Sequence, residues 1–380
     1  MSLRWVSVVS LMPILLALRA SAASIAVSGS MVIASLWGDG EVVGFDMDER
    51  SMIKWRVATG KPWALIEPLD ESRVAFWTGS DISVVDSKTG DTVTKIAPEA
   101  CTNAAICAVD ASLDGRVVLL LRHQGLDYEM QCYSQPGGKF LWKQNLALTN
   151  ANVLLRTCAN VIGVVFSPVE YRLDSNGVEV PVRGGTGWMV LKGENGTIIR
   201  THLVKYQGAD PYRQEFRIGR RLAIRIGRWI WMVSGDTGEE IASLETSMQA
   251  ESFKAWSAQS IVLGYPEVVE VVDISDLRKK RTIDLPGCTG AFSLVGNWLD
   301  YGIGYCDLRT GEVIRRPKTR MPDGYLCVGE IPFRQGTICR SVQQQRSVEA
   351  GATERAALIW RNILSGECTL LYEESRGRGR

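Results

Sequence analysis

One hairpin recurs along the whole chain: an apolar strand ends at a short polar residue, a glycine follows four positions later, and a second strand begins. The segment from Ile82 to Ile96 shows the pattern, with Asp86 at the start of the turn and Gly90 at its end. A short polar side chain can accept a hydrogen bond from its own backbone two residues on, and glycine adopts positive φ without a Cβ clash. The pattern therefore predicts a pair of antiparallel strands at each copy.

Eight copies align on the position of Asp86, which we call the turn start. The turn starts are Asp46, Asp86, Ser134, Lys192, Ser234, Asp273, Asp307 and Asn362, and the turn glycines are Gly90, Gly138, Gly196, Gly238, Gly311 and Gly366. The copies at Asp46 and Asp273 lack the glycine. Successive turn starts are 40, 48, 58, 42, 39, 34 and 55 residues apart, a spacing typical of the blades of a β-propeller.

We therefore expect an all-β chain folded as a β-propeller of eight blades, each with four antiparallel strands. The number falls to seven if the degenerate copy at Asp273 is absorbed by a neighbouring blade. Each copy has an apolar strand upstream of the hairpin, and a fourth strand is expected in the intervening stretches, for instance from Trp63 to Pro68. The alternative is a β-sandwich of similar hairpins, which would be unusually long for one domain.

The N-terminus carries a second signal. Arg4 precedes an apolar run from Trp5 to Leu18, and Ala20-Ser-Ala22 follows, which is the order of a secretory signal peptide cleaved after Ala22. The alternatives are a first propeller strand or an uncleaved anchor. We expect a signal peptide at 1–22, the propeller at 23–373 without a transmembrane segment, and a disordered Arg/Gly tail at 374–380. The expected location is a lumen of the secretory pathway or the outside of the cell.

The chain has nine cysteines, which would lie in an oxidising environment after export. Cys101 and Cys107 are the best candidates for a disulfide because a five-residue spacer in a loop can bring their sulfurs together. Cys132 and Cys306 lie in strand patterns and are expected to be buried thiols. No CxxC or Cys/His cluster has zinc spacing, so no metal site is predicted. Asn195, in an Asn-Gly-Thr sequon on a turn, is a candidate glycosylation site.

Candidate catalytic residues are few. His123 and His202 are the only histidines and stand in strand-like contexts, where a structural role is the more frequent one. The glycine-rich segment 184–187 opens no helix and is expected to be a connector rather than a phosphate-binding loop. The basic clusters 278–281 and 315–320 are expected to be solvated turn charges, with a ligand-facing patch as the alternative. A net charge of +1 argues against a general role on nucleic acid. No catalytic residue, cofactor or metal is predicted.

Two turns are followed by a tryptophan, Asp46 by Trp55 and Ser134 by Trp142. This pattern resembles the repeat of quinoprotein-type (PQQ-like) propellers, over about residues 24–372. Tryptophans at these positions usually pack blade against blade, although an exposed aromatic rim would use the same residue type. The quinone-binding dehydrogenases of that superfamily carry adjacent cysteines and a calcium site. This sequence has no Cys-Cys dipeptide, so the resemblance does not imply cofactor binding.

Within the superfamily, the segments 161–166, 187–191 and 196–200 resemble the lumenal propeller of subunit 1 of the endoplasmic reticulum (ER) membrane protein complex. The resemblance implies a non-catalytic scaffold in the ER lumen, with protein partners that include membrane-complex subunits. The alternative is a secreted or periplasmic quinoprotein or small-ligand-binding propeller. The long spacings predict partner-binding insertions at Tyr171–Gly187 and Pro322–Ala352, because surface loops tolerate extra residues.

Overall fold

The computed structural model describes residues 25–36, 40–48, 52–59, 65–77, 81–98, 104–112, 115–123, 127–149, 151–168, 171–173, 179–181, 185–204, 213–319, 321–322, 325–343 and 353–377. These residues form an eight-bladed β-propeller with blades of four antiparallel strands and contain no helix. Accordingly, no helix in this part of the chain is long and apolar enough to cross a membrane. The expected fold class is confirmed. The predicted signal peptide lies outside the described residues.

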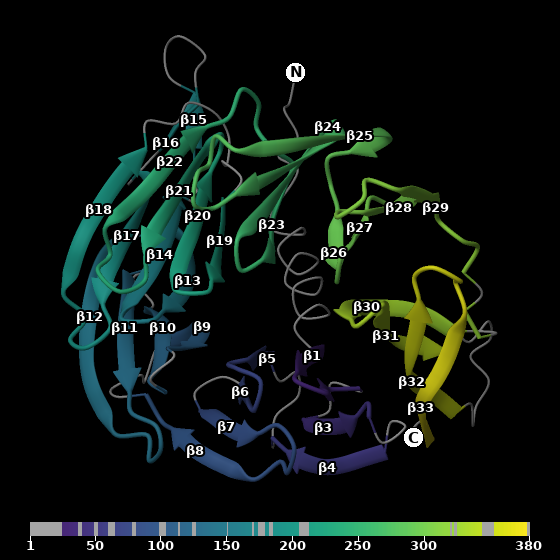
Figure 1. Ribbon diagram of the computed structural model, residues 1–380. Helices are drawn as coiled ribbons and strands as arrows, with labels where there is room; N and C mark the ends of the chain where they lie inside the picture. The colour runs from purple at the N-terminus through teal and green to yellow at the C-terminus, as the bar shows by residue number, and fades with distance from the viewer. Residues whose placement is uncertain are drawn as a thin grey trace, which may run out of the picture. The chain divides into compact units, whose positions relative to one another are not determined.

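The chain divides into two compact units, residues 1–93 with 317–380 and residues 94–316. Figure 1 labels the strands of the blades. The first unit holds blade 1, with β1 (Ile25–Ser28), β2 (Met31–Ala34), β3 (Glu41–Asp46) and β4 (Met52–Ala58), and blade 2, with β5 (Leu65–Pro68), β6 (Arg73–Trp77), β7 (Ile82–Asp86) and the start of β8 (Thr92–Ile96). It also holds blade 8, with β30 (Tyr325–Phe333), β31 (Gly336–Gln343), β32 (Thr353–Asn362) and β33 (Cys368–Gly377). β1 lies beside β30, so the first and last blades are neighbours.

The second unit holds blades 3 to 7. Blade 3 has β9 (Ala104–Ala111), β10 (Val117–His123), β11 (Asp127–Tyr133) and β12 (Phe140–Thr149), and blade 4 has β13 (Ala151–Cys158), β14 (Val161–Pro168), β17 (Thr186–Lys192) and β18 (Ile198–Val204). Blade 5 has β19 (Arg213–Ile218), β20 (Arg221–Ile226), β21 (Trp229–Ser234) and β22 (Glu240–Glu245). Blade 6 has β23 (Ser252–Ser257), β24 (Ser260–Asp273) and β25 (Lys280–Thr289), and blade 7 has β26 (Ser293–Val295), β27 (Trp298–Asp300), β28 (Gly304–Asp307) and β29 (Val313–Arg315).

Blade 6 reaches four strands because β24 folds back on itself. A straight strand of 14 residues would separate its ends by about 46 Å. Instead, the backbone nitrogen of Ile274, just beyond β24, donates a hydrogen bond of 3.0 Å to the carbonyl of Gln259, just before it. Glu267 has a φ of 63° between the two halves. The copy at Asp273 is therefore a complete blade.

All eight predicted turn starts end the third strand of a blade or immediately follow it. Six turns share one pattern, in which the nitrogen of the turn glycine donates to the carbonyl of the turn start, as Gly90 does to Asp86 at 2.9 Å. The side chain of Asp86 also accepts a hydrogen bond from the nitrogen of Lys88 at 2.8 Å. The same bond, to a residue two positions on, recurs at Asp46, Ser234, Asp273, Asp307 and Asn362.

Burial differs between the strands of a blade. Middle strands such as β2 and β17 are buried along nearly their whole length, whereas the fourth strand β22 alternates between half-buried and exposed residues. Apolar clusters join the sheets of neighbouring blades, as between blades 3 and 4 and between blades 4 and 5. A middle strand is thus covered on both faces and is apolar throughout, while a fourth strand is half solvated.

Three expectations about segments need correction. The insertion before the fourth turn exists, as the separate hairpin of β15 (Tyr171–Leu173) and β16 (Glu179–Pro181), but Thr186 and Gly187, expected in a connector, already belong to β17. The segment Pro322–Ala352 is mostly blade, because β30 and β31 occupy 325–343. The tail expected to be disordered is partly strand: Glu374 and Arg376 of β33 pair with β32. Residues 378–380 lie outside the described part of the chain.

Candidate interaction surface

One position in the fourth strand of a blade contacts the turn of the next blade. In each blade, this fourth-strand residue is paired in the sheet with the third-strand residue that lies two positions before the turn start. We call it the inter-blade position. Blade 1 has Trp55 there, blade 3 has Trp142 and blade 6 has Arg281. Blades 4, 5, 7 and 8 have Arg200, Ala242, Ile314 and Thr369.

The tryptophans join their blade to the next one in the same way. The indole nitrogen of Trp55 donates to the carbonyl of Ser87 at 2.8 Å, and that of Trp142 to the carbonyl of Gly193 at 3.0 Å. Both acceptors stand one residue after a turn start. The rings also lie on the turn glycines, since a Cβ added at Gly90 would come within 2.5 Å of Trp55. These tryptophans pack blade against blade, as the sequence suggests.

Arg281 uses the same position and the same kind of acceptor. Its guanidinium donates to the carbonyl of Leu308, one residue after the turn start of blade 7, and to that of Arg309 at 2.8 Å. Arg281 belongs to the basic cluster 278–281, which we expected to be solvated turn charges. Arg281 is exposed, as expected of a solvated charge, and it also joins its blade to the next one.

Blades 4, 5 and 8 carry another residue at the inter-blade position, and a groove lies at the junction that follows each of them. The groove between blades 4 and 5 has a volume of about 410 Å³ and includes Ile199 and Asp236, and the groove between blades 5 and 6 measures about 500 Å³ and includes Asp236 and Ile241. A third groove of about 400 Å³ lies between blades 8 and 1. We call them the 4/5, 5/6 and 8/1 grooves. Blade 5 thus has the small side chain of Ala242 where blades 1 and 3 have Trp55 and Trp142.

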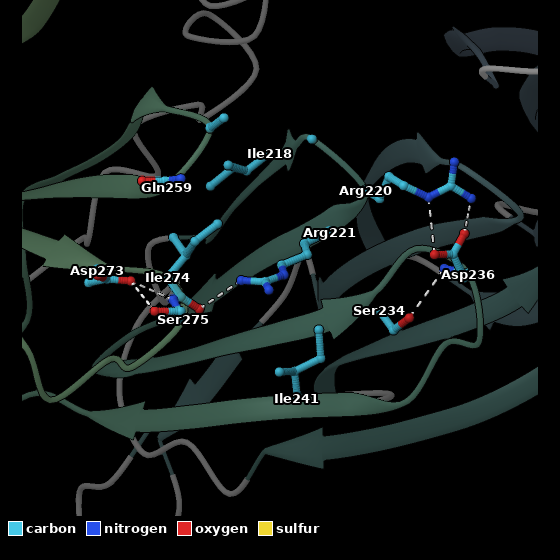
Figure 2. A pocket seen from close by; sticks show the side chains of 12 residues that line it. Ile218, Arg220, Arg221, Ser234, Asp236, Ile241, Gln259, Asp273, Ile274 and Ser275 are labelled. Atoms are coloured by element: carbon cyan, nitrogen blue, oxygen red, sulfur yellow. Dashed lines mark hydrogen bonds and ion pairs between the residues drawn. The ribbon is translucent and has the colours of Figure 1, made fainter.

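The 5/6 groove has polar walls of fixed geometry (Figure 2). Arg220 donates to Asp236 through Nε at 3.1 Å, and this hydrogen bond lowers the pKa of the Asp236 carboxyl. Arg221 donates at 3.2 Å to the carbonyl of Ile274, which stands one residue after a turn start. Arg221 therefore contacts the carbonyl that a tryptophan contacts in blades 2 and 4. The groove combines these charges with the apolar side chain of Ile241, which is 46% exposed.

The outer strand β18 exposes large apolar side chains next to the 4/5 groove. Ile198, Ile199 and Leu203 are 39%, 37% and 67% exposed. β18 is the last strand of its sheet and pairs with β17 alone among the described strands. A strand edge with open backbone groups and exposed apolar side chains is a template for pairing with another chain. Together, β18, Ile241 and the two grooves form what we call the blade 4–5 surface.

An aromatic cluster lies between the same two blades. His202 of β18 stacks on Trp188 with ring centroids 5.4 Å apart and planes 8° from parallel, and it lies 5.2 Å from Trp231 of β21. Trp229, 37% exposed, stacks on Trp231 at 5.9 Å. His202 is thus packed among aromatic rings, in agreement with its expected structural role. Trp229 is the member of the cluster that lies at the protein surface.

A buried acid on the first strand of blade 5 was not found from the sequence. Glu215 of β19 is 7% exposed, and its carboxyl oxygens have no hydrogen-bond partner among the described residues. Burial raises the pKa of Glu215 to about 8, against the lowering effect of Arg156. Asp110, which lies 3.7 Å from Arg156, raises it further. The residues come from the first strands of blades 3, 4 and 5, so only the blade arrangement brings them together.

The remaining predicted site residues lie apart from this surface or on its border. Asn195 is exposed on the turn of blade 4, where its Oδ1 accepts from the nitrogen of Thr197 at 3.0 Å, and its glycosylation stays a prediction. Cys107 is exposed on β9, and Cys101 lies outside the described residues, so the disulfide also stays a prediction. Cys132 and Cys306 are buried thiols, as expected.

Comparison of the sequence with known protein families and with curated proteins gives no match. Solved structures do match. Apo AztD from Citrobacter koseri aligns with a TM-score of 0.54 at 12% identity, over 91% of this chain and 98% of that one. The dihydro-heme d1 dehydrogenase NirN aligns with a TM-score of 0.52 at 14% identity, over 92% of this chain and 74% of that one. At such identities the likeness shows the propeller fold alone.

BamB from Moraxella catarrhalis also aligns, at 13% identity and a TM-score of 0.48, over 83% of this chain and 92% of that one. The comparisons agree with the β-propeller fold. They give no support to the narrower resemblance to subunit 1 of the ER membrane protein complex.

Proposed function

We propose that this protein is a non-catalytic propeller scaffold that binds an extended segment of a partner protein at the blade 4–5 surface. The observation that carries the proposal is the exposure of Ile198, Ile199 and Leu203 on one outer strand. Middle strands of the same blade are buried along almost their whole length. A partner strand could therefore gain main-chain hydrogen bonds along β18 and cover its apolar side chains.

The grooves give the surface its specificity. In strand addition, main-chain hydrogen bonds supply affinity and pockets for alternate side chains supply selectivity. The 4/5 and 5/6 grooves flank one turn and share Asp236. A side chain of the partner could enter each groove and meet an exposed apolar residue, Ile199 or Ile241, beside charged residues. This arrangement fits a mixed polar and apolar protein segment better than a uniformly charged ligand.

The proposed compartment is one reached by secretory export. The order of charged, apolar and small residues over 1–22 supports it. The finer proposal is the ER lumen, as part of an ER membrane protein insertion or folding complex, and the alternative is a periplasmic or secreted protein. Fusing residues 1–30 to a reporter tests export in either case, and retention of the reporter in the cytosol would contradict it.

Site-specific photocrosslinking in the producing cell tests the binding surface. A photoreactive amino acid replaces Ile199 or Leu203 on β18, and the matched control replaces Thr92, which is exposed on the outer strand β8. We expect one discrete covalent adduct from each β18 position and none from Thr92. The same adduct should disappear when Ile241→Asp is added, because that change places a charge in the neighbouring groove.

Two outcomes would contradict the scaffold. Equal crosslinking from Thr92 and from β18 would show that the surface has no selectivity. Binding of a quinone with calcium by the purified protein, with reduction of a dye by an alcohol substrate, would show that the protein is a quinoprotein enzyme.

A further inference from the structure

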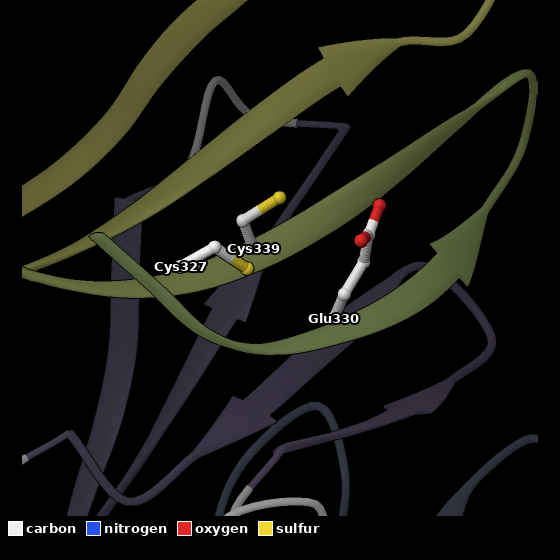
Figure 3. Close-up of side chains that lie close together, drawn as sticks. All are labelled: Cys327, Glu330 and Cys339. Atoms are coloured by element: carbon white, nitrogen blue, oxygen red, sulfur yellow. The ribbon is translucent and has the colours of Figure 1, made fainter. Parts of the chain in front are cut away.

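Three potential metal ligands meet on one face of blade 8. Cys327 and Glu330 belong to β30 and Cys339 to β31, and the two sulfurs and a carboxylate oxygen all lie within 4.8 Å of one another. Figure 3 shows the three side chains gathered over the two paired strands. This is the single group of three or more His, Cys, Asp or Glu ligands that the described residues bring together at such distances.

A β-bulge makes this meeting possible. In a regular strand, residues 327 and 330 would point to opposite faces, because side chains alternate. The pairing shifts by one residue between Cys327, opposite Ser341, and Gly329, opposite Arg340, so that Glu330 comes to lie opposite Cys339. The extra residue restores Cys327 and Glu330 to one face. Bulges commonly re-aim a side chain next to a functional site.

Two cysteine sulfurs and a carboxylate favour a particular class of cation. We propose that Cys327, Glu330 and Cys339 bind one thiophilic divalent cation of the Zn²⁺ class. Two thiolates and a carboxylate are ligands that Zn²⁺ accepts in a tetrahedral site, with Zn–S distances of about 2.3 Å and sulfurs therefore roughly 3.8 Å apart. The three ligands need to close in only slightly to reach that geometry. Water takes the fourth position.

The charges around the site balance when the cation is bound. Arg361 of β32 forms an ion pair with Glu330, and its side chain is 10% exposed. Two thiolates, one carboxylate, a divalent cation and the guanidinium sum to zero. A ligating carboxylate usually has such a second partner, which fixes its orientation. Binding releases two thiol protons to solvent, one each from Cys327 and Cys339.

The two thiols differ in burial. Cys339 is 1% exposed, whereas Cys327 is half-buried. A disulfide between the two cysteines is the alternative to cation binding, and mass spectrometry distinguishes the two.

The test uses the full-length protein, reduced and then transferred to metal-free buffer, with Zn²⁺ titrated against a chromophoric chelator. We expect one equivalent of tight binding. Cys327→Ser and Cys339→Ser should each abolish it, and Glu330→Gln should weaken it at least about tenfold, the lower end of the loss seen when a ligand's support is removed. Cys107→Ser, in another blade, is the control and should leave binding unchanged.

Cd²⁺ provides a second readout, because thiolate-to-cadmium charge transfer absorbs in the ultraviolet only when sulfur is a ligand. Glu330 is exposed at the surface, so Glu330→Gln reports on the site even if a serine variant fails to fold. The proposal is overturned if no equivalent binds, if binding survives in folded Cys327→Ser or is unchanged in Glu330→Gln, or if mass spectrometry finds Cys327 and Cys339 joined in a disulfide that the reductant does not open.

Discussion

The indole nitrogen of Trp55 in blade 1 donates a hydrogen bond to the carbonyl oxygen of Ser87 in blade 2, at 2.8 Å. The same bond joins Trp142 to Gly193 between blades 3 and 4, at 3.0 Å. A single side chain thus satisfies a turn carbonyl and fills the space beside it. Blades 4, 5 and 8 have another residue at this position, and grooves lie at the junctions that follow them.

Trp142→Phe should lower the free energy of unfolding by about 1–3 kcal/mol, because the carbonyl of Gly193 loses its donor in a buried setting. Trp229→Phe is the matched control, since Trp229 is 37% exposed, and it should cost less than about 0.5 kcal/mol. Chemical unfolding followed by circular dichroism measures both. Equal losses would show that the hydrogen bond at the turn adds nothing.

Gly196→Ala and Gly311→Ala separate backbone strain from contact with tryptophan. Both glycines end the repeated turn, with φ of 73° and 80°. A Cβ at residue 196 would come within 2.6 Å of Trp142, whereas one at residue 311 would have no described atom within 4 Å. We expect Gly311→Ala to cost about 1–2 kcal/mol from backbone strain and Gly196→Ala about 1–3 kcal/mol more from overpacking. Thermal unfolding of the two variants measures the difference, and a cost at residue 311 equal to that at residue 196 would refute the contact.

Stability should fall as pH rises because of Glu215. Its pKa is raised from 4.5 to about 8 by burial, so the folded state holds a proton that the unfolded state releases above its own pKa. The free energy of unfolding is therefore highest below pH 4.5. It declines between the two pKa values, at about 1.4 kcal/mol per pH unit. Glu215→Gln should remove this slope, whereas Glu312→Gln, an exposed carboxyl on a turn, should keep it. Unfolding midpoints at several pH values measure the slope, and its persistence in Glu215→Gln would rule out this residue as the cause.

The blades could be predicted from the sequence because their determinants are local. Asp86 and Gly90 lie within one turn, and their chemistry acts over five residues. Sequence reasoning did not find the contact of Arg281, whose partner is the carbonyl of Leu308 in the next blade. It also placed 325–343 in an insertion, because the length of a repeat does not reveal which residues are extra.

The proposed metal ligands escaped prediction for a related reason. Sequence motifs for metal sites have ligands a few residues apart in one turn. Cys327 and Cys339 instead lie on two strands of a hairpin. Glu330 joins them only through a bulge, which reverses the face that alternation would assign to it. Glu215 is a comparable case, because its neighbours Arg156 and Asp110 belong to other blades.

Ala242→Trp tests the link between the open groove and partner binding. It restores the residue type found in blades 1 and 3 at the inter-blade position. The indole should occupy part of the 5/6 groove, leave the melting temperature unchanged or raised, and reduce the photocrosslinked adduct from Leu203. A stable variant with undiminished adduct would show that the partner does not use this groove.

The most direct test of the scaffold is the comparison of photocrosslinking from Leu203 and from Thr92 in the cell that makes the protein. The account predicts a discrete adduct from Leu203, identified by mass spectrometry as one partner protein, and none from Thr92. Failure of Leu203 and Ile199 to give any adduct above the level of Thr92 would contradict the central claim that the exposed outer strand of blade 4 is the surface on which this propeller acts.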